Sequence, residues 1–421
     1  MMFPTTDSTE NVLGIKDRNI KFDENLPFET KKIKDERAAV YHAKLESQET
    51  RCVNCGFEGS LIKYGTKTCR LKLPNVTATR QPVYLELKKQ HYLWKQCRTT
   101  FMAKTEVVAA HCSITRPVHW AITLDARTNT SLKTIAQRYH ISSASVQRIL
   151  IQDNAYSLQE KRNYLPEHLC FDEFKATDTY SFIWMDAQSH ALGAVLPSRR
   201  IATLKDYFLG FPLAERLKVK SIVVDLNAAY INFIPAVFPN VQIIIDRFHI
   251  INMANRALNT CRKRLMKQQK RSSREYKLLK SNWRIFLRDA KTLEAKKLSY
   301  HPAVGYYDTD VNLVHLALSL DETFKQTYEV YQGIYSAVHD RDAKALKAVL
   351  NNYRPLHNEM DTTIRSLKIH WQALLNSCRY DYSNGPIEGA NYKIKEIKRT
   401  SYGFRNQRNF KLRIYLQFAH I

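Results

Sequence analysis

The spacing of apolar residues predicts helices in one part of the chain and strands in another. Between residues 131 and 139, apolar positions recur three and four residues apart, as on one face of a helix. Ser142 or Ser143 can cap a second helix after a short turn. From 166 to 250, short apolar runs alternate with helical segments, which is typical of an α/β domain. The expected strands are 169–174, 180–185, 191–196, 221–224 and 241–245, and the expected helices lie around 200–210 and 228–237.

The remaining segments predict other kinds of structure. Residues 51–104 mix short alternating stretches with turn residues, which indicates a small β-rich module, and 250–380 look wholly helical. The boundaries that these patterns predict are 1–48 with no assigned role, 49–105 for the β-rich module, 106–160 for a helix-turn-helix, 161–250 for the first part of an α/β core, 251–380 for an all-helical basic insertion, and 381–421 for a final helix and tail.

Composition makes this a globular chain with room for several domains. It has 421 residues, of which 44% are hydrophobic, and its longest apolar runs fall far short of the roughly 18 residues of a membrane-spanning helix. The N-terminus shows no secretory signal. The eight cysteines are widely spaced, as in a reducing compartment. We therefore expect a cytoplasmic protein with no membrane partner.

The excess of positive charge is the strongest indication of the kind of partner that the protein binds. There are 65 Lys and Arg residues against 40 Asp and Glu, a formal charge of +25. The excess is concentrated: 51–104 holds 11 basic and 2 acidic residues, 251–300 holds 15 and 3, and 384–413 holds 8 and 2. DNA or RNA is the first candidate partner and an anionic membrane surface the second. Clustering of this kind disfavours the alternative of a merely solvated basic surface.

Two aspartates lie in or directly after predicted buried strands, where a charged side chain needs a partner. Asp172 is within the apolar run 170–174, and Asp225 directly follows 222–224. A carboxylate there is costly unless it is paired, hydrogen-bonded or bound to metal, and ligands of α/β sheets bind at the carboxyl ends of strands. For one aspartate alone, a helix cap or turn is the better interpretation. Two on neighbouring strands favour a cation, Mg²⁺ or Mn²⁺ rather than zinc.

A third carboxylate is available near the C-terminus. Glu388 falls in the first turn of the last predicted helix, where the helix dipole tolerates negative charge. Asn391 and Lys395 follow on the same face, and Lys398 or Arg399 extends it by a turn. A metal-binding glutamate beside residues that hold a DNA backbone explains this arrangement. The alternative is an ordinary basic surface helix.

These motifs resemble the ISL-three family of bacterial insertion-sequence transposases, which carry a DDE-type catalytic domain. The resemblance runs through nearly the full length in the family's order, and its last two segments are the most specific. The matching segments are GIKDRNI (14–20), CVNCG (52–56), CSITRPV (112–118), CFDEF (170–174), VVDLNAAY (223–230), FPNVQIIIDRFHI (238–250) and YSNGPIEGANYKIKEIKRTSYGFRN (382–406).

The resemblance implies a ribonuclease-H-like α/β catalytic core with a long all-α insertion, preceded by a small β-rich zinc-finger-like module and a helix-turn-helix. It implies that Asp172, Asp225 and Glu388, spaced by 53 and 163 residues, are the ligands of Mg²⁺ or Mn²⁺. Two such ions would support in-line phosphoryl displacement on DNA. The expected partners are double-stranded DNA at the transposon ends and target, and a second protomer, so that a homodimer or larger assembly would act in the nucleoid.

Other polar residues near the predicted strand ends receive smaller roles. His249 is expected to help catalysis by contacting the scissile or a flanking phosphate; the alternative is a structural Asp246 cap with His249 bonded to it. Asp186 is interpreted as structural. Glu173 neighbours Asp172 but should point to the opposite face of its strand.

The N-terminal half contains two candidate DNA-recognition features. Cys52 and Cys55 form half of a zinc site with Cys97, but Trp94 stands where the family pattern has its remaining cysteine. Cys69 or His91 would then be the fourth ligand, or the module is metal-free with Trp94 filling the space. In the helix-turn-helix, the residues expected to reach a major groove are Ser143, Ser145, Gln147 and Arg148.

Together these features predict a DDE transposase that binds terminal inverted repeats and cleaves and transfers DNA strands. The altered cysteine module leaves open a catalytically inactive or repurposed sequence-specific DNA-binding protein. A ribonuclease-H-like nuclease would share the metal site without strand transfer.

Overall fold

The computed structural model describes residues 12–23, 28–52, 54–59, 61–75, 81–158, 163–175, 179–302 and 304–419. The chain divides into two compact units, one of residues 1–160 with 394–421 and the other of residues 161–393. Residues 1–11 of the expected N-terminal segment lie outside the described part. None of the described helices has both the length and the apolar character that spanning a bilayer requires.

A six-stranded sheet dominates the N-terminal part of the first unit. Its order is β1-β3-β5-β4, with β2 paired to β3 and β6 to β5, and only the β3–β5 pair is parallel. The sheet takes in residues of the expected 1–48 segment, because the apolar side chains of β1 and β3 pack into the same core as those of β5. The strands are β1 (Ile20–Phe22), β2 (Phe28–Ile33), β3 (Glu36–Leu45), β4 (Leu61–Leu73), β5 (Val83–Trp94) and β6 (Thr100–Met102).

The same unit contains a helical cluster with its own core. The predicted pair of helices is present as α3 (Leu132–Tyr139) and α4 (Ser143–Asp153), preceded by α2 (Arg116–Arg127) and followed by the short η1 (Ala155–Leu158). Ser142 caps α4, its hydroxyl accepting from the backbone N–H of Ser145. The C-terminal helix α16 (Gln407–Phe418) adds Leu412 and Leu416 to the core of this cluster.

The second unit is built on a mixed five-stranded sheet of order β11-β10-β7-β8-β9. β7, β8 and β9 form an antiparallel meander, and β10 and β11 continue the sheet in parallel with β7. All five strands fall where the apolar runs predict them. They are β7 (His168–Lys175), β8 (Tyr180–Asp186), β9 (Leu192–Leu196), β10 (Ser221–Val224) and β11 (Gln242–Ile245).

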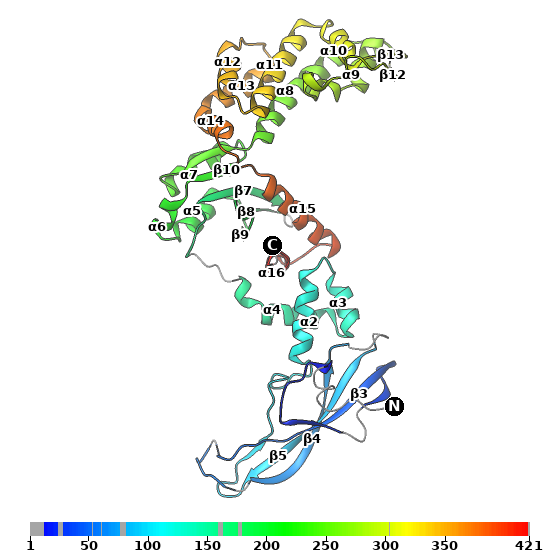
Figure 1. The fold of residues 1–421 in the computed structure, drawn as a ribbon, viewed down its shortest axis with the longest axis vertical. Helices are drawn as coiled ribbons and strands as arrows, with labels where there is room; N and C mark the ends of the chain where they lie inside the picture. The colour runs from blue at the N-terminus through cyan, green and yellow to red at the C-terminus, as the bar shows by residue number, and fades with distance from the viewer. Residues whose placement is uncertain are drawn as a thin grey trace. The chain divides into compact units, whose positions relative to one another are not determined.

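The two faces of this sheet are covered differently. Phe171, Ile222 and Val224 share a core with α5 (Ile201–Leu209) and α7 (Ala228–Val237), and α6 (Leu213–Lys218) lies between those helices in sequence. Cys170 alternates with Phe171 and points to the other face, where its thiol contacts the Ser383 carbonyl just before α15 (Gly385–Thr400). Figure 1 shows α15, in orange-red, beside β7 and β8.

The insertion between β11 and α15 is mainly helical but differs from the all-helical prediction. A short antiparallel hairpin pairs Tyr300 with Tyr307; such three-residue strands are too short to leave an alternating pattern. The elements are α8 (Arg247–Gln268), α9 (Arg274–Ser281), η2 (Ile285–Leu287), η3 (Ala290–Thr292), β12 (Ser299–His301), β13 (Tyr306–Asp308), α10 (Asp310–Leu318), α11 (Glu322–His339), α12 (Ala343–Asn352), α13 (Glu359–Ile369) and α14 (Trp371–Arg379).

The last insertion helix returns the chain to the edge of the sheet. The Asn376 side chain donates to the Ile243 carbonyl at 2.8 Å, and the Ser377 hydroxyl donates to the Ile245 carbonyl at 2.6 Å, so α14 satisfies backbone acceptors of edge strand β11. Arg247 donates to the carbonyls of Ser377 and Tyr380 at the end of α14. These contacts fix the segment that leads into α15.

Candidate active site

Three aspartates lie level with one another across neighbouring parallel strands. β7 and β10 pair with an offset of 53 residues, as in Cys170 with Val223, and β10 and β11 pair with an offset of 21, as in Val224 with Ile245. The same offsets place Asp225 beside both Asp172 and Asp246. Because parallel strands lie about 4.8 Å apart, the sheet brings these three residues together on the side where β10 and β11 end.

Asn384 connects the start of α15 to all three strand ends. Its backbone N–H donates to Asp246 Oδ1 at 3.0 Å, and its side-chain amide donates to the Phe171 carbonyl at 3.3 Å and to Asp225 Oδ1 at 3.5 Å. Its own carbonyl accepts from the Glu388 N–H, the first helical bond of α15. The side chain is 2% exposed. Asn384 therefore sets where Glu388 lies along the sheet.

Asn391 makes a second connection, one turn beyond Glu388. Its amide Nδ2 donates to Asp172 Oδ2 at 2.6 Å, and the residue is buried. The helix turns this side chain, which the sequence predicts to contact DNA, toward β7, where its amide donates within the protein. Positions 384, 388 and 391 share one face of α15, so Glu388 lies between two asparagines that hold the helix on the carboxylates.

The carboxylates perturb one another's protonation. Burial, together with the negative charges of Asp225, Glu173 and Glu388, raises the pKa of Asp172 to about 7. Desolvation and the charges of Asp246 and Asp225 raise the pKa of Glu388. The contact of His249 Nδ1 with Asp225 Oδ2, at 3.3 Å, raises the pKa of His249. Excess negative charge of this kind favours a bound cation.

The donor set fits divalent ions that prefer oxygen ligands. Within the described ranges, the buried amide oxygens of Asn384 and Asn391 have no hydrogen-bond partner, so water molecules on a hydrated ion could donate to them. Asp172, Asp225 and Glu388 are not among the described groups whose ligand atoms all lie within 4.8 Å of one another. A single-ion cage is thus not preformed. Asp172, Asp225 and Glu388 would instead hold divalent ions as separate oxygen ligands, and such ions would supply charge for phosphoryl displacement.

The other polar residues of the strand ends lie as follows. The His249 imidazole contacts the Asp225 carboxylate, whereas its backbone N–H donates to the Asp246 carbonyl and the Asp246 carboxylate accepts from Asn384. Glu173 points to the opposite face, as predicted, where Tyr230 donates to it at 3.0 Å. Asp186 accepts from the Gln188 N–H and the Ser189 hydroxyl within its own turn, in agreement with a structural role.

Apart from Asn391, the candidate DNA-binding residues lie in the first unit. On α15, Lys395 and Arg399 are exposed and Lys398 is half-buried. On α4, Ser143 and Arg148 are exposed and Gln147 is half-buried. The Ser145 hydroxyl is hydrogen-bonded to that of Ser142. Ser143 and Arg148 are thus the best placed on α4 to contact a partner.

The three expected cysteine ligands come together. Cys52, Cys55 and Cys97 form a group whose sulfur atoms lie within 4.8 Å of one another, and the hydrogen bond with the Thr99 hydroxyl lowers the pKa of Cys97 to about 6. Neither proposed fourth ligand, Cys69 or His91, belongs to this group of described residues; the Cys69 thiol donates to the Leu87 carbonyl.

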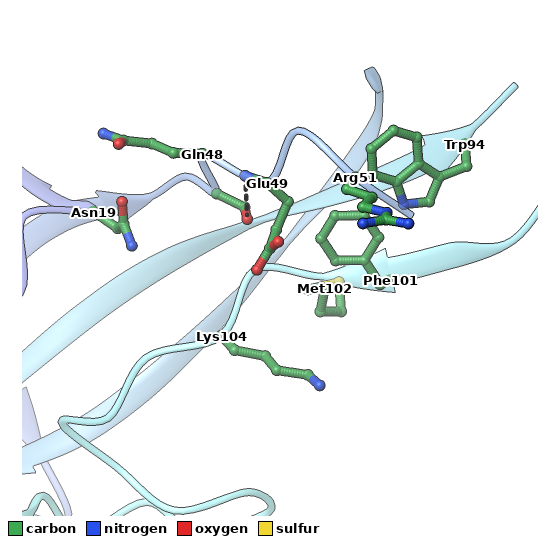
Figure 2. Close-up of a pocket in the computed structure, with 9 residues that line it drawn as sticks. Asn19, Gln48, Glu49, Arg51, Trp94, Phe101, Met102 and Lys104 are labelled. Atoms are coloured by element: carbon green, nitrogen blue, oxygen red, sulfur yellow. Dashed lines mark hydrogen bonds between the residues drawn. The ribbon is translucent and has the colours of Figure 1, made fainter. Parts of the chain in front are cut away.

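Trp94 lines a cavity together with Arg51 and Phe101. Figure 2 shows Trp94 beside Phe101, with Arg51 close by, in a cavity of about 330 Å³. The Trp94 and Phe101 rings stack with centroids 6.3 Å apart, and Trp94 is only 2% exposed. The tryptophan is thus a buried residue of the module, and the Cys52, Cys55 and Cys97 thiols are grouped in its presence.

Sequence reasoning did not identify Asn384 and underestimated Asp246. The signal for Asp246 is the repeated pattern of an apolar strand ending in Asp, at 225 and again at 246. Asn384 leaves no comparable signal, because its role depends on how α15 packs across the sheet.

Comparisons with known proteins find one family model and two relatives. A family model of DDE transposases of the ISL-three group, described as "Transposase", matches residues 169–414, more than half of the chain. "Transposase for insertion sequence element IS1001" of Bordetella parapertussis is 24% identical over 259 residues, 60% of this chain and 61% of that protein. "ATP-dependent protease" of Lactococcus lactis subsp. lactis is 33% identical over 112 residues, 27% of this chain and 36% of that protein. The aligned regions thus span less than two thirds of either relative.

Proposed function

Because the chain belongs to the ISL-three family of DDE transposases, we propose that it binds the terminal inverted repeats of an insertion sequence and catalyses metal-dependent DNA cleavage and strand transfer. The second unit would be a ribonuclease-H-like catalytic domain interrupted by a helical insertion. Its mixed five-stranded sheet, with a meander on one side of β7 and parallel strands on the other, supports that assignment.

The observation that carries the proposal is the alignment of Asp172 with Asp225 and the attachment of the Glu388 helix to both. The register puts two carboxylates on adjacent strands, and hydrogen bonds from Asn384 and Asn391 hold the helix that bears the third. The first and last of the three carboxylates, Asp172 and Glu388, are 216 positions apart in the sequence (388 − 172). A purely structural sheet has no need to gather three carboxylates there.

The roles of the residues follow from their chemistry. Divalent ions, when bound, would activate a water molecule or a DNA 3′-hydroxyl and stabilise the leaving oxygen. Asp172, Asp225 and Glu388 would hold them, and Asn391 orients the Asp172 carboxylate by donating to Oδ2. His249 stays beside Asp225, where its imidazole can donate to a phosphate oxygen of the DNA.

We assign DNA recognition to the first unit. Ser143 and Arg148 of α4 would contact the major groove, and Lys395, Lys398 and Arg399 of α15 would contact DNA phosphates. The grouped Cys52, Cys55 and Cys97 thiols would hold zinc in the β-rich module. The active complex would contain at least two protomers, one for each transposon end.

The decisive experiment supplies the purified protein with DNA carrying the sequences that bracket its reading frame, and Mg²⁺ or Mn²⁺. We expect nicked and joined products from the wild type and none from Asp225→Asn, while both bind DNA with equal affinity in an anisotropy titration. Asp206→Asn is the matched control, since Asp206 is exposed on α5, and should cleave normally.

The other outcomes separate the alternatives. Nicking without joining would point to a nuclease. Sequence-specific binding without cleavage by the wild type would point to a DNA-binding protein without catalysis. Normal cleavage by Asp225→Asn would refute the metal site.

A further inference from the structure

Helix α8 carries a row of exposed cations that begins at the candidate active site. It starts directly after Asp246, and His249 in its first turn contacts Asp225. Arg256 follows seven residues later, Lys263 seven after that and Lys267 four further on, all exposed. We call Arg256, Lys263 and Lys267 the cationic stripe.

The stripe lies on one face of the helix, away from the core. At 100° per residue, His249 and the three stripe residues fall within an arc of about 40°. The buried residues of α8 occupy the opposite side, centred about 140° away by the same geometry. They are Ile250, Ala254, Ala257, Leu258, Cys261, Arg262 and Leu265.

The stripe residues are not neutralised by ion pairs. On α8, Arg264 is an exposed cation that forms an ion pair, with Glu359 at 2.5 Å. In the described part of the chain, no acidic oxygen lies within 4.0 Å of the side-chain nitrogens of Arg256, Lys263 or Lys267. Residues 251–300 as a whole carry 15 basic and 3 acidic residues. A row of like charges repels itself unless a polyanion neutralises it.

We propose that the cationic stripe is the track along which double-stranded DNA flanking the cleaved phosphate lies, its backbone held by Arg256, Lys263 and Lys267. This inference rests on the proposed function and adds the residues and the path. From His249 to Lys267 the helix rises 18 residues, about 27 Å, which matches roughly eight base pairs at 3.4 Å each.

The first test compares single charge removals on the same helix. Fluorescence anisotropy with a labelled 30-base-pair duplex gives the slope of log affinity against log salt for each variant. Lys263→Gln should reduce the magnitude of the slope by about 0.9, and the triple variant Arg256→Gln/Lys263→Gln/Lys267→Gln by about 2.7. Arg264→Gln is the matched control and should leave the slope nearly unchanged, because Glu359 already neutralises that charge. Lys263→Arg should keep the wild-type slope.

The second test measures the path. Duplexes that keep the recognised end and shorten the flanking DNA beyond the cut should lose affinity for the wild type as the flank falls below about eight base pairs. The triple variant should bind long and short flanks alike. Thermal unfolding of each variant checks that the fold is kept, as expected for exposed side chains.

The outcomes distinguish the inference from the proposed function. If Lys263→Gln and Arg264→Gln change the slope equally, or if the triple variant keeps the wild-type dependence on flank length, the track is refuted even when Asp225→Asn abolishes cleavage. If Asp225→Asn leaves cleavage intact while the stripe variants lose DNA affinity, the metal site fails and the DNA surface stands.

Discussion

At the scale of single residues, the burial of Asp172 among other carboxylates should lower the stability of the metal-free protein. Its pKa of about 7 exceeds the unfolded value of about 3.9, so between these pH values the native state binds more protons and the stability falls as pH rises. Asp172→Asn should therefore stabilise the metal-free protein by about 1–2 kcal/mol at pH 8, after allowance for partial solvent screening, and hardly at all at pH 4. Denaturant unfolding at the two pH values measures this. Equal stabilisation at both would contradict it.

Asn391 should act on metal binding without contacting DNA. Asn391→Leu keeps the branched shape of the side chain and removes the donor to Asp172 Oδ2, so we expect the Kd for Mn²⁺ to rise by about 10–100-fold, as for other residues that orient a metal ligand. Cleavage should recover in part at high Mn²⁺, which a folding defect would not allow.

The control for Asn391 is its neighbour on the helix. Tyr392 is 72% exposed, so Tyr392→Ala should leave the Kd for Mn²⁺ unchanged. An unchanged Mn²⁺ affinity in Asn391→Leu itself, measured by isothermal titration, would show that the hydrogen bond is only structural.

The sequence identifies some residues of the site and not others for a physical reason. Asp172 and Asp225 stand out because a carboxylate beside a buried strand is unusual, and their separation of 53 residues equals the pairing offset of their strands. Glu388 is a candidate because it falls in the first turn of the last predicted helix, and the family resemblance names it as the third ligand. Asn384 could not be found, since an asparagine before a helix is ordinarily a cap, and only the packing of α15 on the sheet shows its different use.

At the scale of elements, regularly periodic segments are predictable and short or irregular ones are not. The strands β7 to β11 and the helices α3, α4, α5 and α7 follow directly from apolar spacing. The hairpin β12–β13 and the strands β1 to β3 do not. β1, β12 and β13 have three residues each, β2 has no buried residue, and the buried positions of β3 do not alternate regularly. Their conformation depends on strand pairing, which is local for β12–β13 and reaches from β3 to β5 in the N-terminal sheet.

The cysteine module yields a prediction at this scale. Three grouped thiols, one of them with a lowered pKa, provide zinc ligands but not the complete set of four. We expect one zinc ion per chain when the zinc released by denaturing the purified protein is measured colorimetrically, and none from Cys97→Ser. Cys112→Ser is the control, because Cys112 is exposed and outside the group. A metal-free wild type would instead support a module stabilised by the Trp94 core alone.

The end of α2 shows how the C-terminal helix joins the first unit. Arg413 is 2% exposed and donates to the carbonyls of Ala126 and Thr130, while Gln417 donates to the Thr128 carbonyl at 2.8 Å. Carbonyls at a helix C-terminus lack partners within the helix, and a guanidinium also suits the helix dipole. This contact joins residues 287 positions apart (413 − 126), which explains why the expected 381–421 segment divides between two units.

At the scale of the whole molecule, the two units have separate cores and should respond separately to substitution. The sheet of the second unit packs with its own helices, whereas α2, α3, α4 and α16 form another core. Arg413→Met removes charged hydrogen bonds from a buried site, so it should destabilise the first unit by about 2–4 kcal/mol. Asp172→Asn should stabilise only the second.

Differential scanning calorimetry at pH 8 without metal tests this separation. We expect two transitions. Arg413→Met should lower one by roughly 5 °C or more, and Asp172→Asn should raise the other, with each variant leaving the remaining transition in place. Helix α15 is continuous and contributes residues to both units. If both variants shift a single shared transition, this helix couples the unfolding of the two units. The binding of DNA by one unit could then change the stability of the carboxylate site in the other.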